Sequence, residues 1–355
     1  MHATQTTPQR SQHQTSRIAR WMGWVAVAGI VGMVLPVQAQ EGLLRTQVID
    51  LRPGWNAVYL EVDPVATAPA DVFGSLPIDV VATYTEASSG SQYVKNPTVN
   101  MLQSYGWAVW YAPARSDAFL SNLFGILGSK SYLILARTNA TLSVTGIPAY
   151  IATAWQPNAY TLVGFNLVPS AEPTFAQFFR GSTAHRHNRI YRMVDGVWRQ
   201  VVNPAGTTMR AGEAYWIYSD GRSDYNGPLD VSTGTRFGVM LDAASGSQVI
   251  FRNRTDHPIA FTVDHLAAPS QPIPLSTPVS AVDQSTGDTG TLYIHYEAGT
   301  FTQSFPALAG GQSIRWPLEL RSRDAGNATM HSLLKITSDM GTAAYVPVTA
   351  TRDGQ

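Results

Sequence analysis

Apolar and polar residues alternate in short runs along most of the chain, and this is the pattern of β-strands with one buried face. The first run covers residues 47–62 and is interrupted by a turn signal at Pro53-Gly54. Three short helices are expected, because proline or an N-cap residue precedes an apolar stretch at 69–73, 116–127 and 173–179. The other strands expected before residue 232 are 80–84, 106–111, 131–135, 140–144, 160–168, 189–193, 196–198, 212–218 and 228–231.

One segment of this pattern occurs twice. Residues 53–64 are echoed by residues 157–169, with Trp55 aligned on Tyr160 and apolar positions matching downstream. The elements that follow recur in the same order: a proline-initiated helix, a strand, a tryptophan-containing strand, a strand with Gly and Tyr, and a closing strand. An ordered series of this length indicates two related β modules.

The repeat also resembles a β module that is common in exported bacterial proteins. Such modules read G-W-N, then G-x-W, then G-x-x-Y-W. The matching segments here are Gly54-Trp55-Asn56, Gly106-Trp107 and Gly212-x-x-Tyr215-Trp216. The second copy has Asn158-Ala159-Tyr160 in place of G-W-N. The resemblance covers residues 47–231 and implies an all-β accessory module outside the cytoplasm, with no catalytic residues to carry over.

The third segment has a different rhythm, with seven or eight short strands separated by turn signals. This spacing predicts a two-sheet sandwich similar in size to immunoglobulin-like or fibronectin-like domains, without their cysteine pair. Residues 267–290 are rich in Pro, Ser and Thr and are interpreted as a long connection. The expected strands are 237–241, 248–253, 259–264, 291–296, 300–305, 313–320, 332–337 and 343–349.

The predicted fold class is therefore mainly β, with two related β-rich modules that contain short helices, followed by an immunoglobulin-like β-sandwich. The expected boundaries are 40–150 for the first module, 151–233 for the second and 234–355 for the sandwich.

The N-terminus has the pattern of a secretory signal. Residues 1–20 contain three arginines and no acidic residue, an apolar run follows to about Val37, and Val37-Gln38-Ala39 supplies the small residues that a signal peptidase reads. Cleavage is expected after Ala39, which places the mature chain in the periplasm, at the cell surface or outside the cell. The alternative is an uncleaved membrane anchor. Gln40 in place of cysteine argues against a lipoprotein.

Composition narrows the function classes. The chain has no cysteine, so disulfides, thiol catalysis and Cys-ligated metals are excluded. Loss of residues 1–39 leaves 21 basic and 24 acidic side chains, a formal charge of −3. The chain therefore lacks the excess of basic residues that is typical of a nucleic-acid-binding protein. No apolar run after the signal approaches 18 residues, so no transmembrane segment is expected in the mature chain.

Few residues suggest chemistry, and nucleophile-elbow, zinc-helix and phosphate-loop motifs are absent. Glu61 and Asp63 are spaced as a carboxylate pair on one strand face, although a solvated face explains them as well. His185-x-His187 offers two metal or anion ligands, or an exposed polar loop. Asp220, Asp224 and Asn226 place three oxygen side chains in one turn, which would suit calcium, or an ordinary turn. No other cofactor is expected.

Aromatic residues are the remaining candidates for binding. Trp110, Tyr111 and Trp216 could stack on sugar rings, or they could fill small β cores. Two main function classes follow: an exported, non-catalytic structural or adhesive protein of the bacterial envelope or surface, and a secreted carbohydrate-binding accessory protein. The expected partners are accordingly other cell-surface proteins or a polysaccharide. A hydrolase with dispersed acidic residues is a third class.

Overall fold

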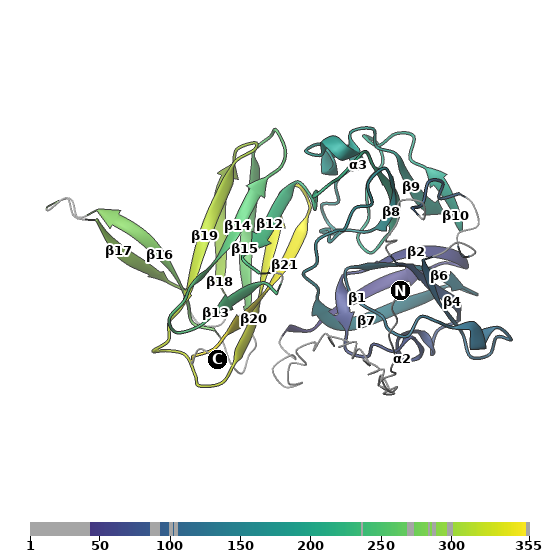
Figure 1. Cartoon of the computed structure of the whole chain (residues 1–355), viewed down its shortest axis with the longest axis horizontal. Helices are drawn as coiled ribbons and strands as arrows, with labels where there is room; N and C mark the ends of the chain where they lie inside the picture. Colours follow the sequence, from purple (N-terminus) through teal and green to yellow (C-terminus); the bar gives the residue numbers. More distant parts are fainter. Residues whose placement is uncertain are drawn as a thin grey trace, which may run out of the picture. The chain divides into compact units, whose positions relative to one another are not determined.

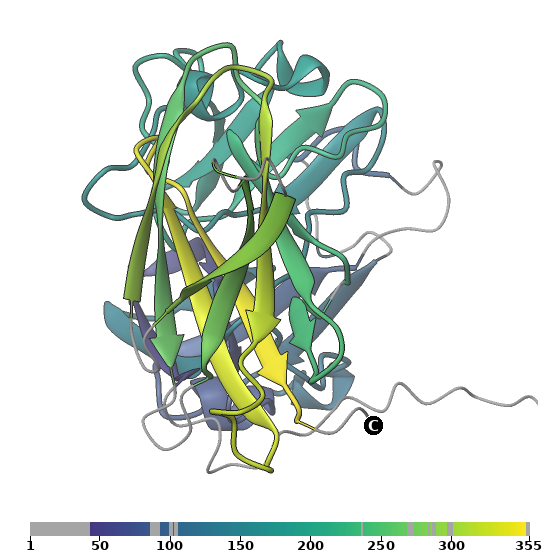
Figure 2. The same cartoon turned by 90° about the vertical axis from the view of Figure 1, so that its left-hand side faces the viewer.

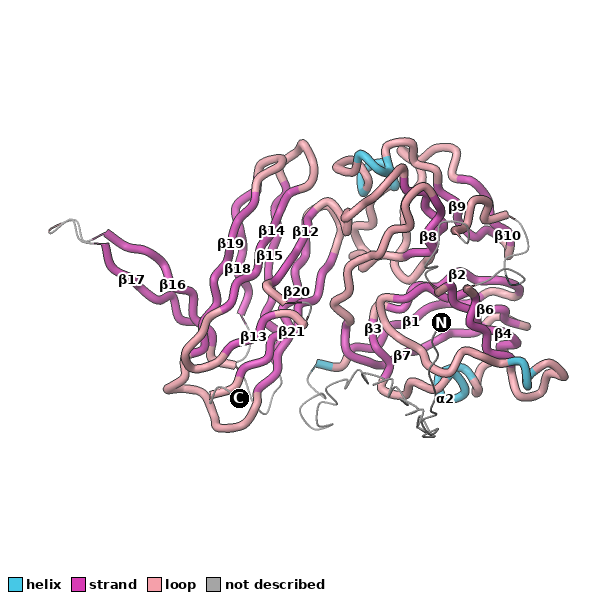
Figure 3. Tube along the Cα trace, in the orientation of Figure 1, coloured by secondary structure: helices cyan, strands magenta, loops and turns pink. Residues whose placement is uncertain are grey.

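The computed structural model describes residues 43–85, 93–98, 102, 106–235, 237–267, 273–282, 285, 289–296 and 301–352. The chain divides by its contacts into residues 1–35 and 36–355, and all described residues belong to the latter. Strands dominate them (Figures 1 and 3), which confirms the predicted mainly β fold class. Among these residues no helix is long and apolar enough to cross a membrane.

The first module consists of two antiparallel sheets with the strand orders β1-β7-β3 and β2-β6-β4-β5. The short helix α2 (Pro69–Phe73) forms where it was predicted, with proline in its first turn. Leu60, Ile134 and Leu142 are fully buried between the elements. The strands are β1 (Arg45–Leu51), β2 (Gly54–Leu60), β3 (Val62–Pro64), β4 (Ile78–Tyr84), β5 (Trp107–Tyr111), β6 (Lys130–Ala136) and β7 (Ala140–Pro148).

The helix predicted over residues 116–127 was wrong. Only a single 3-10 turn forms, η4 (Ala118–Leu120), and the chain then runs extended beside β5. Side-chain oxygens of Ser121 and Asn122 accept hydrogen bonds from the backbone N–H groups of Tyr111 and Val109, at 3.0 and 2.6 Å. The segment therefore supplies acceptors for the backbone N–H groups on the outer edge of β5, and these hydrogen bonds compete with helix formation.

The second module contains one four-stranded sheet with the order β10-β9-β11-β8. Its predicted helix forms as α3 (Phe175–Phe178), where Thr174 and Gln177 make a reciprocal capping box. A 3-10 turn, η5 (Thr183–His185), follows. The strands are β8 (Ala159–Val163), β9 (Ile190–Val194), β10 (Val197–Gln200) and β11 (Tyr215–Ser219).

The two modules repeat the same sheet, strand for strand. The order β2-β6-β4-β5 in the first module corresponds to β8-β11-β9-β10 in the second. The register also repeats, because Trp55 pairs with Leu135 as Tyr160 pairs with Tyr218. The last strand pair agrees too: Tyr84 faces Trp107, and Met193 faces Trp198. The strand order and register therefore agree with the duplication expected from the sequence.

The two modules also share a hydrophobic cluster. The indole of Trp216 lies 6.3 Å from the ring of Trp107 and 6.3 Å from that of Trp198, its two neighbours being equivalent residues of the two modules. The N–H of Tyr59 donates to the carbonyl of Gly212 at 2.8 Å. At the aligned pair Tyr59 and Gly164, a Cβ on the glycine would lie 2.3 Å from the Tyr59 side chain.

The third segment forms two five-stranded sheets, β12-β14-β19-β16-β17 and β13-β21-β20-β15-β18. Their inner faces enclose one core, to which Phe251 and Trp316 contribute from one sheet and Phe261 and Val346 from the other. The strands are β12 (Leu229–Thr233), β13 (Val239–Leu241), β14 (Ser247–Asn253), β15 (Ile259–Ala267), β16 (Leu275–Val282), β17 (Thr289–His295), β18 (Phe301–Leu308), β19 (Ser313–Leu320), β20 (Met330–Ser338) and β21 (Ala343–Ala350).

Two assignments in this part of the sequence were wrong. Strand β12 was expected to close the second module, but it pairs with β14 of the sandwich. Residues 267–290 were expected to be a connection, but they contain β16, which pairs with β17. We call β16 and β17 together the hairpin arm. Figure 1 shows the arm extending beyond β18 and β19, and Figure 2 views it end-on.

Pairing between β16 and β19 stops after two residues. Leu275 faces Leu320 and Ser276 faces Glu319, and no further pair forms. Continued in the same register, Pro278 would stand opposite Pro317. Neither proline has an N–H to donate to a sheet ladder. The two prolines therefore explain why the arm leaves the sandwich at this point.

Candidate functional site

The two tryptophans predicted to bind sugar are buried. Trp110 is 7% exposed and packs against Phe73, with ring centroids 6.3 Å apart. Trp216 is 0% exposed, inside the cluster that the two modules share. Tyr111 is partly exposed, and the guanidinium of Arg115 lies 5.6 Å from its ring centre. The structure brings no stacking surface together from these three residues, so a sugar site built on the two indoles is contradicted.

The three predicted calcium ligands each contact a different protein group. Asp220 forms an ion pair with Arg189. The Asp224 carboxylate accepts from Arg254 at 2.8 Å, and this hydrogen bond lowers the pKa of Asp224. The side-chain oxygen of Asn226 accepts from the backbone N–H of Thr153 at 2.8 Å. Within the described ranges no group of three or more His, Asp or Glu side chains is placed to hold a metal. Calcium binding stays a prediction, and these contacts do not support it.

His185 and His187 also serve different roles. His185 is buried against Trp155, with ring centroids 4.1 Å apart, and its Nδ1 lies 2.6 Å from the Ser182 hydroxyl. Burial lowers the pKa of His185 to about 4. His187 is exposed beside Arg186. Neither sequence-based alternative describes the loop, because one histidine is part of a core and only the other is at the surface.

Glu61 and Asp63 do not act as a pair. Glu61 lines a hollow together with Arg45 and Lys335, and burial raises the pKa of its carboxyl to about 7, against the opposing charge of Arg45. Asp63 instead accepts a hydrogen bond from the backbone N–H of Gly128 at 2.7 Å. The predicted cleavage site after Ala39 lies outside the described residues.

The sequence did not predict a cavity that we call the junction cleft. It has a volume of about 750 Å³, within the usual range for small-molecule sites. Residues from both modules and from the sandwich line it. None of the described lining side chains is charged. The aromatic and amide members of its wall are Tyr59, Tyr150, Phe165, Asn166, Phe178, Asn226, Phe237 and Tyr345.

Polar groups in the junction cleft have unequal hydrogen bonding. The hydroxyl of Tyr150 donates to the carbonyl of Val231 at 3.3 Å. The side-chain oxygen of Asn166 is buried and has no hydrogen-bond partner, although its backbone carbonyl accepts from Ala343 at 3.0 Å. A buried acceptor without a donor costs free energy. This oxygen has almost no exposed surface, so it is enclosed by the protein and is not presented to the cleft.

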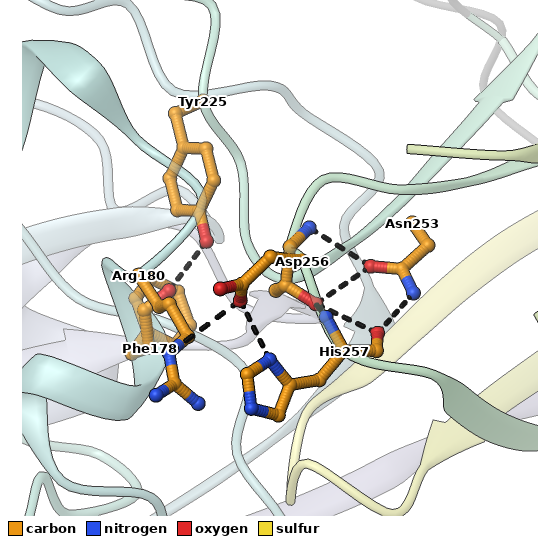
Figure 4. A network of polar contacts seen from close by, with 7 residues as sticks. Phe178, Arg180, Tyr225, Asn253, Asp256 and His257 are labelled. Atoms are coloured by element: carbon orange, nitrogen blue, oxygen red, sulfur yellow. Dashed lines mark hydrogen bonds and ion pairs between the residues drawn. The ribbon is translucent and has the colours of Figure 1, made fainter. Parts of the chain in front are cut away.

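Phe178, which lines the cleft, belongs to the polar network in Figure 4. The Tyr225 hydroxyl donates to the carbonyl of Phe178. The Asp256 carboxylate lies 3.5 Å from Arg180 and 2.7 Å from Nδ1 of His257. Its hydrogen bond from His257 lowers the pKa of Asp256. The Asn253 amide donates to the carbonyl of His257 at 2.6 Å.

The hairpin arm is a second candidate, and it is a surface. All seven residues of β17 are exposed. Val279, Leu292 and Ile294 are 37%, 62% and 50% exposed. These three share one face of the arm, because Val279 pairs with Leu292 and Thr277 pairs with Ile294. Clustered exposed apolar side chains of this kind mark interaction surfaces.

Comparison with known proteins assigns no family. No protein-family model matches the chain, and no curated protein matches it. Among solved structures, PapD-like domain 7 of human CEP192 aligns at 10% identity and TM-score 0.22, over 36% of this chain and 87% of its own. The Salmonella enterica SafA pilin in complex with the SafB chaperone aligns at 14% identity and TM-score 0.22, over 35% of this chain and 55% of that chain.

A longer alignment is no closer in structure. Salmonella alpha-2-macroglobulin reacted with methylamine covers 87% of this chain with 17% of its own length, at 10% identity and TM-score 0.20. Likenesses at this level carry no argument about function. The resemblance to exported G-W-N modules therefore stays a prediction from the sequence.

Proposed function

We propose that the chain is an exported, non-catalytic structural or adhesive protein of the bacterial envelope, which acts by protein contact through the hairpin arm. The supporting observation is the apolar face formed by Val279, Leu292 and Ile294, which lies in solvent on a two-stranded arm. A soluble domain rarely exposes such a cluster unless something covers it. Export is supported by the signal pattern of residues 1–39.

Four of the side chains that could do chemistry support the non-catalytic part of this proposal. Asp220, Asp224 and Asp256 are engaged by arginines, and the His185 ring is enclosed by aromatic residues. A general base must be able to reach the proton that it removes. Hydrolysis of a polysaccharide or peptide by the purified protein would overturn this part.

The contact role is tested by placing charge on the arm. Leu292→Lys combined with Ile294→Lys should greatly reduce retention of the protein on bacterial envelopes, because charge is costly in an apolar interface. Retention is measured by co-sedimentation of purified protein with envelope fractions. Val65→Lys combined with Val202→Lys is the matched control, since both valines are exposed but lie outside the arm. Equal retention of the two double variants would exclude the arm as the contact surface.

Export is tested separately, by expressing the whole chain in a bacterium and sequencing the N-terminus of the product. A mature chain that begins at Gln40 and leaves the cytoplasm is expected. A product that keeps residues 1–39 in the cytoplasm would contradict export without bearing on the arm.

A second candidate function, binding of a neutral saccharide, is favoured by the junction cleft. Its described lining is uncharged, contains several aromatic rings and includes the amide residue Asn166. Asn166→Ala should weaken binding of a neutral oligosaccharide on a glycan array by about tenfold. Asn327→Ala is the control, since Asn327 bonds to Arg352 away from the cleft. Absence of binding across a broad neutral panel would remove this candidate.

A further inference from the structure

Strand β17 is an unprotected sheet edge. It pairs with β16 along one side and ends the order β12-β14-β19-β16-β17, so no described strand covers its other side. Its sequence, Thr-Gly-Thr-Leu-Tyr-Ile-His, contains no proline, lysine, arginine or carboxylate. Natural edge strands are usually blocked by charge, proline or a bulge, because an open edge pairs with other chains. Because charged residues and proline are absent from β17, we infer that this edge pairs with another strand.

The arm also lacks the support that a hairpin needs. Beyond Pro278 it consists of two strands, and pairing with β19 has already ended at Ser276. An isolated two-stranded hairpin is marginal in water, whereas three or more strands with a hydrophobic face are stable. Added strands on the β17 side would supply both the missing pairing and neighbours for Leu292 and Ile294.

We propose that β17 pairs antiparallel with β17 of a second copy of this chain, about a two-fold axis at Leu292. The proposal rests on the contact role of the arm given above. In this register Ile294 stands opposite the second copy's Gly290, and Tyr293 opposite the second copy's Thr291. Ile294 and Tyr293 thus each meet a small residue, Leu292 meets its own copy at the axis, and the space in front of the Gly290 Cβ position is open. Two-fold self-pairing is the commonest form of assembly.

Electrostatics and apolar contact favour the same partner. A strand without charged side chains places no like charges opposite each other when it pairs with itself. The result is a four-stranded sheet, β16-β17-β17-β16, that carries Val279, Leu292 and Ile294 from both copies on one continuous face. A partner of different sequence would need a strand of matching large and small residues, which β17 already provides for itself.

The absence of native cysteine makes the register directly testable. Leu292→Cys should form a disulfide-linked dimer under mild oxidation, because the two sulfur atoms would face each other across the axis. Thr289→Cys should stay monomeric on a denaturing gel, since its two copies would lie about 20 Å apart along the strands, from about 3.4 Å per residue. Equal cross-linking of both variants, or of neither, would overturn the register.

Association is measured by sedimentation equilibrium of the otherwise unmodified protein. Leu292→Lys should raise the dimer dissociation constant by about tenfold or more, because two lysines would meet at the axis. Val202→Lys should leave it unchanged. A monomeric wild-type protein would overturn self-pairing. If the protein is monomeric and its envelope retention still requires the arm, self-pairing is wrong but the contact role of the arm stands. If the protein is a dimer and its retention does not require the arm, only the contact role is contradicted.

Discussion

At the scale of single residues, two buried histidines are sensitive to pH. His265 is fully buried in the sandwich, neither ring nitrogen has a hydrogen-bond partner, and its ring packs 4.9 Å from that of Phe301. Burial lowers the pKa of both His265 and His185 from 6.5 to about 4. Both rings are therefore uncharged in the folded protein at neutral pH.

These histidines should make the free energy of unfolding depend on pH. Between about pH 4 and 6.5 each of these histidine rings binds a proton in the unfolded chain but not in the folded protein. Their contribution to the free energy of unfolding is therefore highest above pH 6.5 and decreases as the pH falls toward 4. His265→Leu should remove a dependence of about 3 kcal/mol, at about 1.4 kcal/mol per pKa unit. Urea unfolding of variant and wild type from pH 4.5 to 8 checks this. The exposed His187→Gln is the control, and parallel curves for His265→Leu would contradict the prediction.

The candidate residues show what residue type alone can predict. Aromatic residues in strands indicated either core or binding surface, and Trp216 became core because the tryptophans of both modules surround it. The side-chain carboxylate of Asp224 accepts a hydrogen bond from Arg254, which lies thirty positions further along the chain. Spacing along a strand predicts which residues share a face, but it does not predict what covers that face.

At the scale of elements, the two modules share a tyrosine contact. The hydroxyl of Tyr132 accepts from the N–H of Leu127 at 2.8 Å and donates to the carbonyl of the same residue at 3.1 Å. Tyr215 makes the same two contacts with Arg210, at 2.7 and 3.4 Å. In each case the tyrosine begins or lies in the strand and fixes the loop five residues earlier. This contact is a physical reason for the tyrosine in the repeated motif.

Removing one hydroxyl should therefore destabilise the protein. Tyr132→Phe leaves two backbone groups of Leu127 without their partner, which should cost about 1–2 kcal/mol in chemical denaturation. Tyr215→Phe should cost at least as much, because the Glu213 carboxylate, 2.8 Å away, is a stronger alternative acceptor for the single hydroxyl proton of Tyr215. Tyr111→Phe, at a partly exposed ring, should change stability by less than about 0.5 kcal/mol. Equal effects at all three tyrosines would show that the loop contact is not the cause.

Most elements could be predicted from alternation and turn signals, and the exceptions have local causes. Strand β16 was missed because Pro278 and its Ser and Thr neighbours are typical of loops, whereas the proline ends pairing on one side only. The prediction of a helix at 116–127 was wrong because the side chains of Ser121 and Asn122 accept hydrogen bonds from the edge strand β5. The alternation of apolar and polar residues does not show that this strand lies beside them. Such partners become visible only once the strand order is known.

At the scale of the whole molecule, the tandem modules are joined through a common core. Trp107 from the first module and Trp198 from the second both pack on Trp216. Backbone hydrogen bonds link Ala57 to Ala214 at 3.0 Å and Tyr59 to Gly212 at 2.8 Å. The two modules should consequently unfold together.

Trp216→Ala should test this coupling. Loss of a fully buried indole should cost about 3–5 kcal/mol and disturb both modules in one transition. Near-ultraviolet circular dichroism, which reports on Trp107 and Trp198, and thermal melting provide the measurement. Phe119→Ala is the control, because that ring is 83% exposed. Two separate transitions, one of them unchanged from wild type, would show that the modules are independent.

The contact between Tyr59 and Gly164 explains why the two copies hold different residues at this position. These are the same position in the two copies, and they touch each other, as residues do beside a two-fold axis. In a dimer of identical modules, one residue type would have to meet itself there, and two tyrosines would collide. Because the two copies are parts of one chain, this position can hold a large ring in one copy and no side chain in the other. Tyr59 and Gly164 both line the junction cleft.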